Sequence, residues 1–262
     1  QLLDWLAATF VESGWDRKAM HRLIVGSATY RQSSKMRVAK AEALLARFPR
    51  RRLQAEQVRD SALAVAGLLD ARIGGPSVFP DQPAGLYEER GQNTAGNSNF
   101  TWKNSVGNDR FRRSMYTYWK RSAPMPNMMA FDAPTREKCV IQRPRTNTPM
   151  QALVTLNDVQ FVEAARLFAQ RVIKEGGADF DSQLDYAMQM TTARSADELR
   201  RHVFRRLYDS QLKVFRDDNK RAGEFLNFGE AKRDKSLDLA EHAAWTTVAS
   251  AILNLDEVIT RE

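Results

Sequence analysis

Cysteine is almost absent from the chain, and this scarcity excludes several classes of site. Cys139 is the single cysteine among 262 residues. A disulfide within the chain and a cysteine-rich zinc site both need partners for it, and the sequence has no C-x-x-C-H motif for covalent haem attachment. We therefore predict no cofactor in this domain, and we interpret Cys139 as a small, buried hydrophobic residue.

Long apolar runs and the common catalytic motifs are missing as well. No segment approaches the roughly 18 uninterrupted apolar residues that a membrane-spanning helix needs. There is no G-x-S-x-G elbow, no P-loop and no G-x-G-x-x-G after a strand pattern, so the usual signals of hydrolases, nucleotidases and Rossmann enzymes are absent. His21, His202 and His242 lie singly in helical patterns, without the spacing of a metal site. We predict structural or surface roles for these histidines and no metal.

The bulk composition is that of a globular, basic protein. Hydrophobic residues make up 43% of the chain and charged residues 27%, which argues against disorder. The formal net charge of +8 favours polyanionic partners, whether nucleic acid, acidic or sulfated polysaccharide, or an anionic surface. The sign of the charge alone does not choose among them.

Helical periodicity dominates the first quarter of the chain. Apolar residues recur at helical spacing over residues 2–11, 19–28, 38–47 and 53–71. We therefore predict that residues 1–72 are helical.

The composition changes at Gly74-Gly75-Pro76, which opens a stretch rich in proline, glycine, asparagine and aromatic residues. Such residues interrupt regular helices. The stretch is too long for an ordinary loop, so we predict an ordered, irregular insert over residues 73–147, with a few short strands as one option.

Helical patterns return over residues 148–262. Thr148 is a candidate N-cap with Pro149 at the first helical position, where its missing N–H has no consequence. Asp158 is placed to start a longer helix, and Ser195 to Glu198 read as a capping box that opens a helix with Leu199, Val203 and Leu207 facing inward. The predicted fold is mainly α: a single helical domain over residues 1–262 with an irregular middle segment.

Basic, aromatic and acidic side chains are concentrated in the middle segment. Arginine pairs bidentately with carboxylate, sulfate or phosphate, and neighbouring aromatic faces can stack on sugars or bases. These residues predict either a groove for an anionic ligand, or an enzyme site with Asp132 or Glu137 as acid or base, or a set of ions that neutralise one another inside a loop-rich core. The candidates are Arg113, Tyr116, Trp119, Lys120, Arg121, Asp132, Arg136, Glu137, Arg143, Arg145 and Asn147.

Two of these candidates precede a helix start. Thr148 and Pro149 are explained by that start, which leaves Arg145 and Asn147 just upstream. We interpret this pair as polar braces that tie the middle segment to the C-terminal helices.

Several motifs, in order along the chain, resemble the C-terminal domain of unknown function of planctomycete cytochrome c-domain-containing proteins. The clearest are Phe131-Asp132-Ala133-Pro134 and Thr146-Asn147-Thr148-Pro149. The others lie at residues 4–7, 14–24, 27–34, 74–78, 118–121, 150–153, 156–158 and 252–257. The resemblance spans nearly the whole chain.

The resemblance implies a context more than a mechanism. We expect a C-terminal fragment of a large exported protein of the periplasm or cell envelope, with haem c in a separate upstream domain. The predicted function is an accessory module that binds an anionic or glycan ligand, or the upstream domains of its own polypeptide. An exported location disfavours nucleic acid as a partner. The alternative is an enzyme of unknown reaction with a polar site in residues 113–147.

Overall fold

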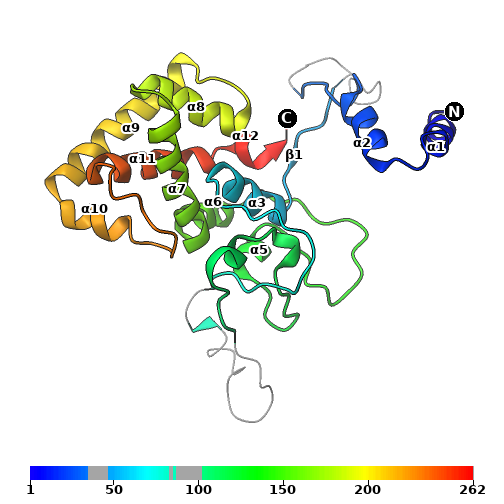
Figure 1. The fold of residues 1–262 in the computed structure, drawn as a ribbon, viewed down its shortest axis with the longest axis horizontal. Helices are drawn as coiled ribbons and strands as arrows, with labels where there is room; N and C mark the ends of the chain where they lie inside the picture. The colour runs from blue at the N-terminus through cyan, green and yellow to red at the C-terminus, as the bar shows by residue number, and fades with distance from the viewer. Residues whose placement is uncertain (35–46, 83–84, 87–101, 262) are drawn as a thin grey trace, which may run out of the picture. The chain divides into compact units, whose positions relative to one another are not determined.

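The fold is mainly α-helical, as predicted. The computed structural model describes residues 1–34, 47–82, 85–86 and 102–261, so most of the helical pattern expected at 38–47 lies outside the described residues. Within these residues, a two-stranded sheet pairs β1 (Arg51–Arg52) with β2 (Thr260–Arg261) (Figure 1). The helices are α1 (Leu2–Glu12), α2 (Arg17–Gly26), α3 (Ala55–Val65), α5 (Pro126–Ala130), α6 (Pro149–Asn157), α7 (Val159–Glu175), α8 (Phe180–Thr192), α9 (Glu198–Asp217), α10 (Asn219–Phe225), α11 (Leu239–Leu253) and α12 (Asp256–Ile259), with 3-10 turns η1 (Gly107–Phe111) and η2 (Ser114–Tyr116).

The chain divides into two compact units, residues 1–51 with 260–262, and residues 52–259. In the first unit, Asp16 caps α2 by accepting hydrogen bonds from the backbone amides of Lys18 (2.9 Å) and Ala19 (3.0 Å). Neither α1 nor α2 contains a buried residue. Among the described residues, no helix combines the length and the apolar character that crossing a membrane requires.

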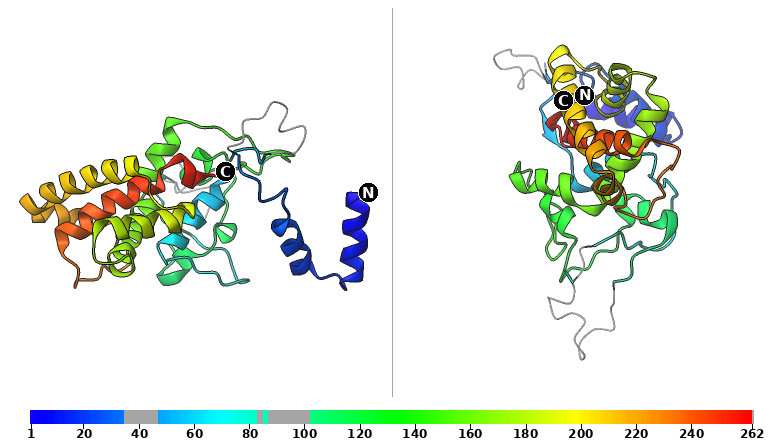
Figure 2. Two further views of the ribbon diagram at one scale, coloured as in Figure 1. Left: turned by 90° about the horizontal axis from the view of Figure 1, so that it is seen from above. Right: turned by 90° about the vertical axis from the view of Figure 1, so that its left-hand side faces the viewer.

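The second unit is built around α11, which packs against both α7 and α9 (Figure 2). Trp245 of α11 is fully buried and stacks on Phe180 of α8, with 5.1 Å between ring centroids. Phe168 of α7 is equally buried in the same core. Most residues of α11 are buried, and most of these are apolar, which agrees with its central position.

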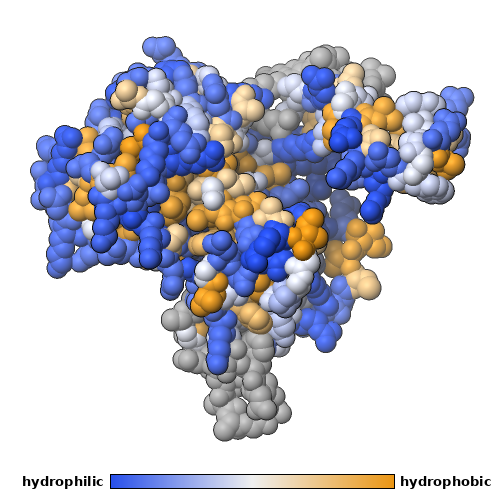
Figure 3. All heavy atoms as spheres, viewed as in Figure 1, coloured by the Kyte–Doolittle hydropathy of each residue, from blue (hydrophilic) through white to orange (hydrophobic). Residues whose placement is uncertain are grey.

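The start of the C-terminal helices follows the sequence prediction closely. Pro149 is the first residue of α6 and Thr148 occupies the N-cap position, although its side chain makes no capping hydrogen bond. Asp158 caps α7 by accepting from the amide of Gln160 at 3.0 Å. On the exposed side of α6, hydrophobic residues including Met150 and Leu153 interrupt the polar surface (Figure 3).

Two predictions for α9 are wrong. The cap is Asp197, which accepts from the amide of Arg200 at 2.8 Å, while Ser195 lies before the helix. Leu199 and Val203 are 72% and 52% exposed, whereas Leu207 is partly buried and packs against the core as predicted. The buried residues of α9 are Phe204 and Phe215. The apolar stripe predicted to face the core is therefore offset from the face of α9 that packs. The large aromatic residues decide which face meets α11.

The described part of the middle segment is irregular. Besides the turns and the short helix α5, it forms isolated bridges, Asp70 with Arg112 and Val78 with Thr117, in place of strands. Buried Arg112 donates to the carbonyl oxygens of Arg72 (3.2 Å) and Pro76 (3.2 Å) and also to that of Gly74. The Gly-Gly-Pro motif therefore wraps around a guanidinium group, which supplies the hydrogen bonds that a sheet would otherwise provide.

Arg59 of α3 also holds the middle segment in place through hydrogen bonds. It is 3% exposed and donates to the carbonyl oxygens of Arg110 (2.8 Å) and Arg112 (3.0 Å) and to the side chain of Gln160 on α7 (2.6 Å). Burial lowers the pKa of Arg59 to about 10, which leaves it charged at neutral pH. This one side chain joins α3, α7 and the η1 turn.

Candidate functional site

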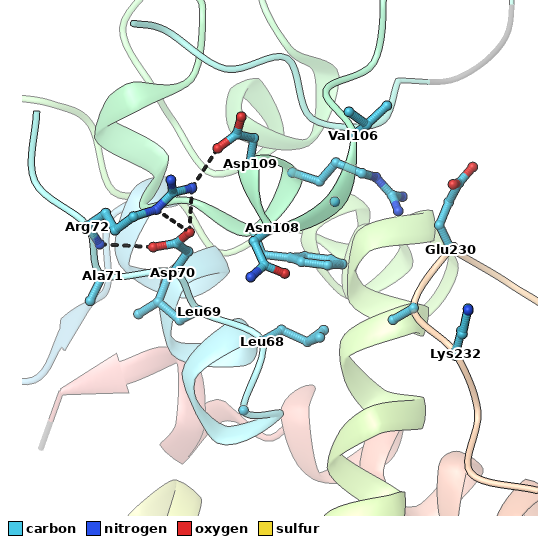
Figure 4. A pocket seen from close by; sticks show the side chains of 15 residues that line it. Leu68, Leu69, Asp70, Ala71, Arg72, Val106, Asn108, Asp109, Glu230 and Lys232 are labelled. Atoms are coloured by element: carbon cyan, nitrogen blue, oxygen red, sulfur yellow. Dashed lines mark hydrogen bonds and ion pairs between the residues drawn. The ribbon is translucent and has the colours of Figure 1, made fainter. Parts of the chain in front are cut away.

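A polar pocket of about 1110 Å³ lies in the second unit, where three segments far apart in the sequence meet (Figure 4). The segments are residues 67–72 after α3, residues 106–111 around η1, and residues 230–232 before α11. They bring charged groups of both signs to one site, together with an amide and several apolar side chains. The lining includes Leu68, Asp70, Arg72, Asn108, Asp109, Arg110, Phe111, Glu230 and Lys232.

The first segment is formed by the end of α3. Gly67 has a φ of +74°, a conformation that favours glycine, and the amides of Leu68 and Leu69 both donate to the carbonyl of Leu63, at 2.9 and 3.1 Å. The amide of Asp70 then donates to the carbonyl of Phe111 at 2.9 Å. These bonds hold the first segment beside η1.

An ion triad forms one side of the pocket. Arg72 donates from Nε to Asp70 Oδ2 at 2.7 Å and from Nη2 to Asp109 Oδ1 at 2.6 Å. The hydrogen bonds from Arg72 lower the pKa of Asp70, and the two carboxylates raise the pKa of Arg72. Asp70 and Arg72 are therefore charged at neutral pH, and Arg72 is held by hydrogen bonds to both aspartates.

The back of the pocket contains a buried arginine. Arg110 is 4% exposed, forms an ion pair with Asp81, and lies 3.6 Å from Glu163 Oε2. Its guanidinium also lies 5.4 Å from the ring centroid of Phe111. Two carboxylates surround this cation, so it fixes η1 and adds little free positive charge to the pocket.

The third segment is held by two charged residues of α7. Glu163 Oε1 accepts from the amides of Glu230 and Ala231, both at 2.6 Å, and Arg166 donates to the carbonyl of Ala231 at 2.6 Å. Gly229 has a φ of +79°, and a Cβ at this position would lie 2.3 Å from Glu163 Cδ. The close approach of this loop to α7 thus depends on glycine.

The side chains carried by this loop remain available to a ligand. Glu230 and Lys232 are exposed, and within the described part of the chain neither charged group has an ion pair. Figure 4 places both across the pocket from Arg72, with Asn108 between the two sides. A ligand here would meet fixed charges on one side and unpaired charges on the other.

His242 of α11 lies outside the pocket; it is fully buried and has a structural role, as predicted. Its Nδ1 accepts from Arg233 Nε at 3.3 Å, so its Nε2 carries the proton and donates to the carbonyl of Arg166 at 3.0 Å. Burial, followed by the nearby Arg233 and Arg166 cations, lowers the pKa of His242 to about 4. His21 and His202 are exposed.

The candidates from the middle segment lie outside this pocket, and they do not gather in one place. Asp132 accepts from the amide of Thr146 at 2.7 Å, and Arg143 pairs with Glu56 at 2.7 Å. Asp132, Arg143 and Arg145 line a hollow of about 10 Å³, room for about one water molecule.

The aromatic candidates are separately engaged. Tyr116 Oη accepts from the amide of Gly74 at 2.7 Å, and Trp119 donates to the carbonyl of Thr135 at 3.0 Å while Arg136 lies 4.9 Å from its ring centroid. Burial lowers the pKa of Lys120. Arg113, Arg121 and Glu137 are exposed. A ligand-binding role for these residues stays a prediction.

Two expectations for this segment are wrong. Arg145 and Asn147 are exposed, and neither side chain has a hydrogen bond or ion pair with any part of the chain that the structure describes. The bracing contacts come from their neighbours, Thr146 with Asp132 and Arg143 with Glu56. Cys139 is exposed instead of buried, because residues 135–142 run along the surface.

The pocket residues were not among the sequence candidates. The local signals were weak: a glycine at position 67 after a helix, and a glycine at position 229 before a charged loop. Neither signal indicates that the two glycines serve one site. The segments are joined by tertiary contacts, such as those of Glu163, Asp70 and Arg72.

Comparison with known proteins identifies a family. A family model described as a protein of unknown function (DUF1553) matches residues 1–208, most of the 262-residue chain. No curated protein and no solved structure gives a match. This confirms the resemblance to a domain of unknown function, while its association with cytochrome c domains and with planctomycetes stays a prediction. The chain belongs to the DUF1553 family of proteins of unknown function.

Proposed function

We propose that this chain is a binding module that holds an acidic oligosaccharide in the polar pocket. One observation carries the proposal: a pocket of about 1110 Å³ presents preset donors and acceptors together with an unpaired lysine. Its volume lies just above the range of about 300–1,000 Å³ typical of ligand sites, which suits an extended ligand.

The lining matches the chemistry of such a ligand. Sugar hydroxyls need both donors and acceptors, which Asp109, Asn108 and Arg72 supply. Carboxylate or sulfate groups pair with a guanidinium or ammonium group, here Arg72 and Lys232. Leu68 and Phe111 give an apolar surface on which a sugar ring can pack.

The electrostatics favour binding over acid–base chemistry at the triad. A general acid at neutral pH needs a raised pKa, whereas the hydrogen bonds from Arg72 lower that of Asp70. An ionised carboxylate held by arginine accepts hydrogen bonds well and donates no proton. The triad is therefore suited to orient hydroxyl groups.

The proposal also has a cellular part, which the family resemblance supports. It places the module in an exported protein of the periplasm or cell envelope, beside upstream domains of the same polypeptide, one of which carries haem c. The net charge of +8 agrees with an acidic polysaccharide as the ligand.

Titration calorimetry with oligosaccharides from heparin, polygalacturonate and a neutral glucan tests the binding. We expect an acidic oligosaccharide to bind and the neutral glucan to bind more weakly. Lys232→Ala should lower the affinity for the acidic oligosaccharide about tenfold, because one charge-assisted contact is lost. Lys235→Ala is the matched control, because Lys235 is an exposed lysine of the same loop that does not line the pocket. Equal losses in both variants, or no binding of any acidic oligosaccharide, would refute the proposal.

A further inference from the structure

A second pocket, apolar and of about 410 Å³, lies between α7, α9, α10, α11 and the end of α6. It belongs to the second unit and shares no residue with the polar pocket. Its volume falls within the range of about 300–1,000 Å³ that small-molecule sites occupy.

Hydrophobic side chains form most of the lining. Phe215 and Phe225 stack in parallel, with 5.6 Å between centroids, and Leu207 and Val162 contribute from α9 and α7. Apolar walls of this kind hold water poorly and favour a hydrocarbon ligand.

The polar residues from α11 do not change this character. Thr246 donates its hydroxyl to the carbonyl of His242 at 2.7 Å, and Thr247 donates to that of Ala243 at 3.2 Å. Both hydroxyls already donate hydrogen bonds within the helix, so they need no water molecule in the pocket as an acceptor. Ser250 and Ala251, both small, complete the α11 side and leave the space open.

A single cation lines the pocket, and no aspartate or glutamate does. Arg221 is exposed, and within the described residues its guanidinium has no ion pair or hydrogen bond. The adjacent Lys220 differs, because it pairs with Glu224 at 3.8 Å and does not line the pocket. An apolar space with one unpaired guanidinium complements a molecule with one anionic end and a hydrocarbon chain.

We propose that this pocket binds a long-chain carboxylate, with the alkyl chain between the helices and the carboxylate on Arg221. Each buried methylene adds to affinity, and the guanidinium fork matches the two carboxylate oxygens. The inference does not depend on the glycan proposal, because it uses other residues and another ligand class.

Dodecanoate, kept below its micellar concentration, is the probe for calorimetry with the full chain. Dodecyltrimethylammonium has the same alkyl chain and the opposite charge. We expect saturable binding of dodecanoate at one site, and binding of the ammonium compound at least about tenfold weaker.

Three variants separate the contributions of charge and space. Arg221→Ala should lower the affinity for dodecanoate about tenfold and remove the preference for dodecanoate over the ammonium compound. Lys220→Ala, the adjacent control, should bind like the parent chain. Ser250→Phe fills the half-buried α11 side of the pocket and should abolish binding, with circular dichroism confirming that the helices are retained.

Several results would overturn the inference. They are the absence of saturable dodecanoate binding to the parent chain, equal affinity for the two probes, and an Arg221→Ala variant that binds as well as the parent chain. Binding that survives in folded Ser250→Phe would place the ligand elsewhere.

Discussion

The middle segment and the C-terminal helices of the second unit are held together in opposite ways. Arg59 of α3 and Arg112 of the middle segment are both buried and donate to backbone carbonyls of that segment. Among the helices, buried apolar side chains such as Phe168 and Trp245 form the core. Irregular backbone needs donors from side chains, whereas helices satisfy their own carbonyls and leave packing to apolar groups.

The ends of the helices complete the comparison. The first amides of a helix lack partners within it, and in this region an aspartate accepts from them at each of five successive helices. In both regions, charged side chains satisfy backbone groups that lack partners in regular secondary structure. Arginines donate to carbonyls in one region, and aspartates accept from amides in the other. The capping residues are Asp158, Asp179, Asp197, Asp218 and Asp238.

Phe168→Ala should give the largest loss of stability. The side chain is fully buried, and its removal leaves a cavity, so we expect a loss of about 4 kcal/mol. Urea unfolding followed by far-ultraviolet circular dichroism measures this. Val203→Ala is the control, because Val203 is more than half exposed, and its effect should stay within about 0.5 kcal/mol. Similar losses in both variants would contradict the placement of the core.

Arg59→Leu tests the other region. It removes the donors that satisfy the carbonyls of Arg110 and Arg112, and we expect a loss of about 3 kcal/mol. Hydrogen exchange should show lost protection around η1 and η2 before α7 and α11 are affected. Arg113→Leu, at an exposed position, should leave the exchange pattern unchanged. Uniform loss of protection across both regions would remove the distinction between them.

This difference also explains how far the sequence could predict the molecule. Helical periodicity and caps such as Asp158 are local signals, so the starts of α6 and α7 were located well, whereas α8 (Phe180–Thr192) was not predicted. The failure at Leu199 and Val203 arose because a stripe of moderate apolar residues cannot show which face meets α11. In the middle segment, Gly74-Gly75-Pro76 was recognised as a motif, but its partner, Arg112, is a tertiary contact that no local pattern encodes.

The candidate site was harder to predict for the same reason. The candidates chosen from the sequence lie in one stretch of the chain, whereas the polar pocket is lined by three segments that are far apart in the sequence. Lys232 and Arg72 become neighbours of one pocket through Glu163 and Arg166 on α7, which hold the loop before α11. The composition of the chain showed its net positive charge, but it could not show that these three segments lie close together in the fold.

Mild acid should destabilise the helical region through His242. Its pKa is about 4 in the folded chain against an ordinary value of 6.5, so the unfolded chain binds the additional proton. This contribution to stability is complete above pH 6.5 and is lost as the pH falls toward 4. At pH 5 we expect a loss of about 2 kcal/mol relative to pH 7.5, measured by urea unfolding.

His242→Gln isolates this effect from the titration of carboxylates. Glutamine can still donate to the carbonyl of Arg166 but does not ionise between pH 5 and 7.5. The difference between the two pH profiles should therefore contain the histidine contribution. Parallel profiles would show that His242 is not held neutral by burial.

The smallest effect concerns the start of α9 and tests which residue satisfies its first amides. Asp197→Ala removes the acceptor of the Arg200 amide and should lower the free energy of unfolding by about 1 kcal/mol. Ser195→Ala should change it by less than about 0.5 kcal/mol, because Ser195 precedes the helix and only accepts from Gln189 at 3.2 Å. A larger loss at Ser195 would restore the capping box predicted from the sequence. It would also leave α9 outside the set of helices that begin with an aspartate cap.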